Sequence, residues 1–83
     1  MAFNILIVDD SKTIRSILSK TLRLTGMEIN QIFEAGNGKE AIEQARLTRP
    51  DVILMDIHMP ALNGLEATRA ILNDLPPTKI VSL

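Results

Sequence analysis

Hydrophobic and polar positions divide the chain into short apolar runs separated by stretches with helical spacing. The clearest run extends from Val52 to Met55, after Pro50 and directly before Asp56. An uninterrupted apolar run of this kind is typical of a strand buried on both faces, as in the centre of a parallel sheet. Because ligands of open α/β sheets bind beyond the carboxyl ends of the strands, we expect chemistry at Asp56.

The N-terminal half of the chain shows a strand, a helix and a second strand. The first strand is predicted over 3–8, and a helix follows from a cap at Asp10 or Ser11 to a stop at Gly26. Its apolar stripe comprises Ile14, Ile17, Leu18, Thr21 and Leu22. A shorter strand is predicted over 31–35.

The C-terminal half repeats this alternation. Residues 36–38 predict a turn, a helix precedes Pro50, another runs from Gly64 to Pro76, and a fourth strand covers 78–83. The inward positions are Ala41, Ile42, Ala45 and Leu47 in the second helix, and Leu65, Thr68, Ile71, Leu72 and Leu75 in the third. The order β-α-β-α-β-α-β predicts one doubly wound α/β domain over 1–83, with a parallel sheet and helices on both faces.

Composition narrows the classes of function. The chain has 83 residues, 46% of them hydrophobic and 2% aromatic, so it is expected to form one small domain with an aliphatic core. A net charge of −1 argues against a nucleic-acid surface or a polybasic membrane anchor. The absence of cysteine excludes disulfides and thiolate sites. With no apparent signal peptide or membrane-spanning run, a cytoplasmic location is expected.

The aspartates at the strand ends are the candidate site. In the strand order 2-1-3-4, strands one and three are neighbours, so Asp9, Asp10 and Asp56 would surround one crevice. Three carboxylates this close repel one another, and a hard divalent cation relieves that repulsion. An all-oxygen site favours Mg²⁺, and an aspartate beside Mg²⁺ can attack phosphorus to form an aspartyl phosphate.

These motifs resemble a known family. Residues 5–11 (Ile-Leu-Ile-Val-Asp-Asp-Ser), residues 51–60 and the pair Asn63-Gly64 resemble the receiver domain of bacterial two-component response regulators. Arg15, a turn after the acidic pair, is similar to chemotaxis-type regulators. Each motif is weak by itself, but their joint occurrence over all 83 residues is specific.

The resemblance implies a flavodoxin-like fold and a role for each matching residue. Asp56 would be the phosphoacceptor, and Asp9, Asp10 and the backbone carbonyl of His58 would help it to hold Mg²⁺. A sensor histidine kinase or phosphotransfer protein would donate the phosphoryl group, and a downstream effector domain or protein would respond. The domain would not be an enzyme beyond self-phosphorylation and self-dephosphorylation.

The resemblance also implies that the domain continues. The family has a hydroxyl residue after strand four and a lysine after strand five, and this sequence stops at Leu83. We therefore expect the N-terminal part of a receiver domain, through the start of strand four, without the final strand and helices. Such a chain would dimerise through strand four, exchange elements with a neighbour, or belong to a longer protein.

Other interpretations stay open at this point. Asp9, Asp10 and Ser11 by themselves could form only a helix cap. The chain could be an interaction module that does not switch, or a Mg²⁺-dependent phosphatase of the haloacid dehalogenase type. Those phosphatases have the motif Asp-x-Asp after their first strand. Here the two acids are adjacent, and Ile57-His58 follows Asp56. Lys12 and Arg15 could meet a phosphate, although a solvated helix face is the simpler expectation for Lys12.

Overall fold

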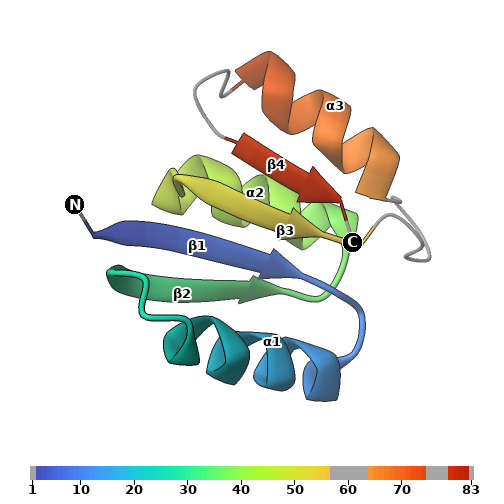
Figure 1. Ribbon diagram of the computed structural model, residues 1–83. Coiled ribbons are helices and arrows are strands. Elements are labelled where there is room, and N and C mark those ends of the chain that lie inside the picture. Colours follow the sequence, from blue (N-terminus) through green and yellow to red (C-terminus); the bar gives the residue numbers. More distant parts are fainter. Residues whose placement is uncertain (1, 57–63, 75–78, 83) are drawn as a thin grey trace.

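The computed structural model describes residues 2–56, 64–74 and 79–82, which form a parallel sheet with helices on both sides (Figure 1). The strands are β1 (Phe3–Val8), β2 (Ile29–Ala35), β3 (Val52–Met55) and β4 (Lys79–Ser82). The helices are α1 (Lys12–Leu24), α2 (Gly38–Thr48) and α3 (Gly64–Asp74). The strand order β2-β1-β3-β4 confirms the predicted doubly wound fold.

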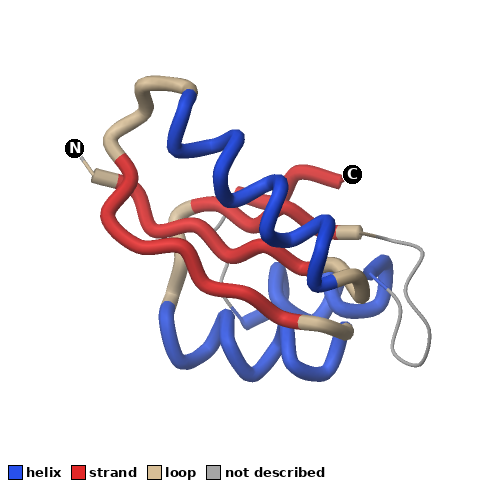
Figure 2. The backbone as a smooth tube through the Cα atoms, turned by 90° about the horizontal axis from the view of Figure 1, so that it is seen from below, coloured by secondary structure: helices blue, strands red, loops and turns tan. Residues whose placement is uncertain are grey.

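The helices divide unequally between the two faces of the sheet. Helix α1 lies on one face, and α2 and α3 lie together on the other (Figure 2). Strand β1 is paired with both β2 and β3, so the chain leaves β1 toward one neighbour and later returns to its other side. The carboxyl ends of β1 and β3 therefore lie side by side, at the point where the strand order reverses.

The main core fills the space between the sheet and the α2–α3 pair. Two small residues of α2, Ala41 and Ala45, are fully buried and let this helix approach the strands closely. The buried cluster comprises Leu6, Val8, Ala35, Ala41, Ala45, Ile53, Met55, Ala67 and Ile71. Because side chains alternate along a strand, Leu6 and Val8 define the face of β1 that belongs to this core.

The face that carries α1 is covered less completely. Ile5 and Ile7 of β1 are buried, but no residue of α1 is, and Ile17 of α1 is 53% exposed. On β3, Ile53 and Met55 are buried while the alternate residues are only half-buried. The prediction that the run 52–55 is buried on both faces is therefore wrong for one face, because α1 alone covers that side among the described residues.

Two local expectations also differ from the structure. β2 begins at Ile29, earlier than predicted, because Ile29 pairs with Phe3 before a register shift. The side-chain amide of Asn30 then donates to Asn4 Oδ1 at 3.0 Å. Leu47 is 79% exposed, so its predicted inward position is wrong. Two residues after Ala45, it lies about 200° around the helix from the buried alanine face.

Candidate functional site

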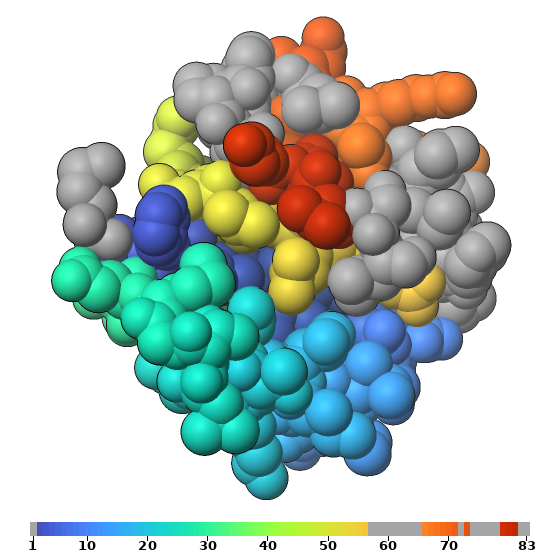
Figure 3. Space-filling model, in the orientation of Figure 1, coloured from blue at the N-terminus to red at the C-terminus, as the bar shows by residue number. Residues whose placement is uncertain are grey.

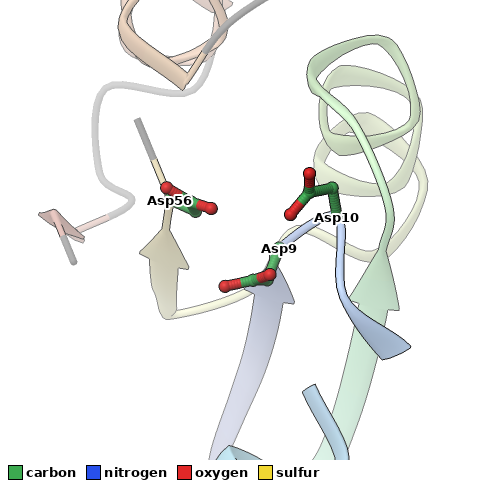
Figure 4. Close-up of side chains that lie close together, drawn as sticks. All are labelled: Asp9, Asp10 and Asp56. Atoms are coloured by element: carbon green, nitrogen blue, oxygen red, sulfur yellow. The ribbon is translucent and has the colours of Figure 1, made fainter. Parts of the chain in front are cut away.

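Three aspartates meet at the carboxyl ends of the two central strands. Asp9 follows β1, Asp10 is the next residue, and Asp56 follows β3 (Figure 4). One carboxylate oxygen from each lies within 4.8 Å of those from the other two. The structure thus brings together the three acidic side chains that the sequence singled out, although two helices and two strands separate Asp10 from Asp56 along the chain.

The sheet itself fixes the two acidic strand ends. The backbone N–H of Asp9 donates to the carbonyl of Ala35 at 3.1 Å, and that of Asp56 donates to the carbonyl of Val8 at 2.9 Å. These bonds continue the ladders of β1 with β2 and of β1 with β3 by one residue. Both acids therefore emerge from well-anchored backbone, and their separation is set by the spacing of neighbouring strands.

The turn after β1 arranges the acidic pair. Asp9 Oδ1 accepts a hydrogen bond from the Ser11 N–H at 2.9 Å, and Ser11 Oγ accepts one from the Ile14 N–H at 3.3 Å. Ser11 is therefore the N-cap of α1, the second of the two predicted options. Because Asp9 is engaged in the same turn, the cap interpretation and the site interpretation hold together.

The three carboxylates differ in exposure. Asp9 is 8% exposed, Asp56 is half-buried and Asp10 is exposed. Unit charges of one sign at about 5 Å repel by roughly 1–3 kcal/mol per pair, depending on how well water screens them. A cation held here would face protein on one side and water on the other, which suits an ion that retains part of its hydration shell.

The sequence analysis named Arg15 as a residue that could meet a phosphate, but it did not predict the contacts of Arg15 within the protein. Its Nη1 donates to the Asp9 carbonyl at 2.7 Å and its Nε to Glu34 Oε1 at 2.9 Å. The signal was the position of Arg15 one helical turn after the cap, together with an acid near the end of β2. The predicted carbonyl ligand, His58, lies outside the described residues.

The donor atoms of the cluster are all carboxylate oxygens. Such a set fits a hard divalent cation and lacks the nitrogen and sulfur ligands that Zn²⁺ prefers.

Within residues 2–56, 64–74 and 79–82, no helix combines the length and the apolar content that crossing a membrane requires.

A doubly wound sheet with an acidic cluster at its switch point defines the general class: an α/β domain whose ligand site lies at the carboxyl ends of the strands. The chain belongs to the response regulator receiver domain family, whose model matches residues 5–83. This family comprises the phosphoacceptor switches of two-component signalling, and the predicted family assignment is confirmed.

Curated relatives include proteins of different overall design. A protein-glutamate methylesterase/protein-glutamine glutaminase of Nitrosospira multiformis is 50% identical over 80 residues, which is 95% of this chain and 22% of that protein. The transcriptional regulatory protein LnrK of Bacillus subtilis is 43% identical over 79 residues, 95% of this chain and 36% of that protein. The chain therefore spans roughly a fifth to a third of these relatives.

Solved receiver structures have the same fold. The response regulator domain of Thermotoga maritima CheB superposes with a TM-score of 0.88 and 36% identity, covering 99% of this chain and 60% of that one. Vibrio cholerae chemotaxis protein CheY4 superposes with a TM-score of 0.84 and 33% identity, covering 99% and 68%. The flavodoxin-like fold assignment is confirmed by these structures.

Proposed function

We propose that Asp56 accepts a phosphoryl group in a Mg²⁺-dependent reaction, and that Asp9 and Asp10 complete the carboxylate part of the metal site. The observation that carries this proposal is the convergence of three carboxylates within 4.8 Å at the switch point of the sheet. The His58 backbone carbonyl is proposed as a further ligand from the family pattern. Membership of the receiver family supports each assignment.

In the proposed reaction, a carboxylate oxygen of Asp56 attacks the phosphorus of the donor. The new oxygen–phosphorus bond forms as the bond from phosphorus to the donor's leaving group breaks, and the electron pair departs with that group. A bound Mg²⁺ would shield the negative charge that carboxylate and phosphoryl oxygens share. Asp9 is anchored at its N–H and its carboxylate, so it can hold its position while the acceptor reacts.

The donor is proposed to be a sensor histidine kinase or a phosphotransfer protein, and the recipient of the signal a downstream effector. We propose that the chain has no catalytic turnover of its own beyond gaining and losing this phosphoryl group. The methylesterase named above is an enzyme as a whole protein, but the match covers 22% of it. We place 1–83 as the N-terminal part of a receiver domain and, as a further proposal, in the cytoplasm.

Phosphorylation by a small acyl phosphate tests this function directly. With Mg²⁺ and acetyl phosphate, the wild-type chain should gain the mass of one phosphoryl group, and Asp56→Asn should not. Asp9→Asn and Asp10→Asn should label more weakly at a given Mg²⁺ concentration, because they lose a ligand but retain the nucleophile.

The matched control is Asp51→Asn. Asp51 lies at the opposite end of β3, where its Oδ2 accepts the Asn4 N–H at 2.8 Å. An asparagine retains an acceptor oxygen there, so labelling should stay at the wild-type level. Labelling that persists in Asp56→Asn would move the acceptor to another residue and overturn the proposal.

A further inference from the structure

The guanidinium of Arg15 connects three elements next to the acidic cluster. From α1 it reaches the carbonyl of Asp9 at the end of β1 and the carboxylate of Glu34 in β2, at 2.7 and 2.9 Å. Its side chain is only 16% exposed, unlike a typical solvated arginine on a helix surface.

The carbonyl that Arg15 binds belongs to the peptide that joins Asp9 to Asp10. The N–H of Asp9 is held by Ala35 and its carboxylate by Ser11. Because Arg15 holds the carbonyl, the N–H, the carboxylate and the carbonyl of Asp9 all have hydrogen-bond partners, and these bonds restrain rotation of the peptide. Asp10 thus lies between two held peptides, because Arg15 binds the carbonyl before it and Asp9 Oδ1 accepts the N–H of Ser11 after it. Restraint on both planar peptides restrains the direction in which the Asp10 side chain leaves the backbone.

We infer that Arg15, held by Glu34, is a positioning residue that orients Asp10 and so sets the cation affinity of the acidic cluster. The inference rests on the function proposed above. Asp10 is exposed, so the surrounding protein constrains it less than it constrains Asp9. Its direction depends on the preceding peptide, and Arg15 holds that peptide from outside the cluster. Residues that orient metal ligands typically change metal affinity by roughly 10- to 100-fold.

The sign of the effect separates positioning from simple electrostatics. Arg15 is a positive charge close to a cation site, so by charge alone its removal should tighten Mg²⁺ binding. Positioning predicts the opposite, a weaker site. Glu34 offsets much of the positive charge and holds the guanidinium against β2, which keeps Arg15 on the carbonyl instead of on a carboxylate of the cluster.

The test is the Mg²⁺ dissociation constant of the full chain, measured by calorimetric titration well below the unfolding temperature, without any phosphodonor. Arg15→Met should weaken binding by roughly 10-fold. Glu34→Gln retains an acceptor oxygen for Arg15 Nε and should weaken binding less. Arg23→Met, which removes the arginine in the last turn of the same helix, is the matched control and should bind as the wild type does.

A double variant tests whether Glu34 acts through Arg15. Adding Glu34→Gln to Arg15→Met should cause no further loss, because the residue that it holds is gone. If the second change weakens binding as much as it does in the wild type, Glu34 acts by its own charge and the inference fails. Arg15→Lys retains the charge but cannot span both partners, so it should bind as weakly as Arg15→Met.

The outcomes also separate this inference from the proposed function. If the wild-type chain binds no Mg²⁺, both the proposed metal site and this inference are wrong. A wild-type chain that binds Mg²⁺, with Arg15→Met binding equally or more tightly, would overturn the inference alone. Should Arg15→Met fail to fold, wild-type affinity in both Arg15→Lys and Glu34→Gln would still overturn it.

Discussion

The backbone N–H of Asp56 donates to the carbonyl of Val8 at 2.9 Å. Val8 is the last residue of β1 and directly precedes the acidic pair, so this bond joins the two halves of the site. The side chains of the cluster are therefore placed by the same ladder that holds β3 against β1. Any change that shifts this register by one residue would turn Asp56 to the other face of the sheet.

Mg²⁺ should raise the thermal stability of the chain. A ligand present at 100 times its dissociation constant stabilises the folded state by about 2.7 kcal/mol. Asp10→Asn should lose most of this gain. Without metal, the same variant should be more stable than the wild type by roughly 1 kcal/mol, because one like charge is removed from a water-exposed cluster. Thermal unfolding with Mg²⁺ and with chelator checks both signs, and equal melting temperatures in the two conditions for the wild type would contradict the metal site.

Asn37→Ala should lower the free energy of unfolding by about 1 kcal/mol. Asn37 Oδ1 caps α2 by accepting the Glu40 N–H at 2.9 Å. Glu40 Oε1 in turn accepts the N–H of Gly36, the residue before the cap, at 3.0 Å and the side-chain amide of Asn37 at 3.3 Å. Asn37→Ser retains an acceptor at the cap and should retain most of the stability. Urea titration measures the difference. A cap variant as stable as the wild type would show that α2 is held by packing alone.

Arg49→Gly should raise the free energy of unfolding by up to about 1 kcal/mol. Arg49 ends α2 with φ 45° and ψ 63°, in the left-handed region that strains a residue with a Cβ by roughly 1–2 kcal/mol. Glycine relieves this strain but loses part of the gain to the flexibility of the unfolded chain. Arg49→Ala retains the Cβ and is the control, with no gain expected. The denaturant concentrations at the unfolding midpoints of the wild type and the two variants measure this order of stability.

A polypeptide of these 83 residues should self-associate. Ile14 and Ile17 of α1 are 42% and 53% exposed, and Val81 on the edge strand β4 is 44% exposed. Atoms of β3 and β4 reach the surface above α1 (Figure 3). An exposed apolar edge strand is a template for pairing with a second chain. Sedimentation should show a mass that rises with concentration.

Charge on the edge strand should reverse this association. Val81→Lys should shift the chain toward monomer, because a charged edge resists strand pairing. Leu47→Lys is the matched control, since Leu47 is 79% exposed on α2, on the other side of the sheet. A wild-type chain that stays monomeric at every concentration would contradict the prediction of a homodimer through β4.

The sequence predicted most of the fold because its strongest signals are local. Each of these signals lies within a single segment of the chain. The structure has strands at the apolar runs, a helix that begins after Ser11, and a positive φ at Gly26 just beyond the end of that helix. Leu47 and the half-covered face of β3 were missed because burial depends on which neighbours exist across the sheet. The early start of β2 was missed because backbone pairing with Phe3 tolerates the polar residue Asn30 on an edge strand.

For the site, the sequence predicted the acids but not what holds them. Asp9, Asp10 and Asp56 end apolar runs, and the switch-point rule brings such ends together. The hydrogen bonds from Arg15 to Asp9 and Glu34 join a helix and two strands, so the spacing of Arg15 after the cap does not by itself identify these partners. Their detection needed the packing of α1 against the sheet.

The central position of β1 has a consequence for the order of folding. β1, α1 and β2 are consecutive in the chain and can associate over short loops, whereas β3 pairs with β1 only across the intervening α1, β2 and α2. Such non-local pairing closes a larger loop and is expected later. Asp56 would therefore join Asp9 and Asp10 only as β3 docks. A cation that needs all three carboxylates binds only once β3 has docked. If that docking follows the folding transition state, the cation should slow unfolding and leave the folding rate nearly unchanged.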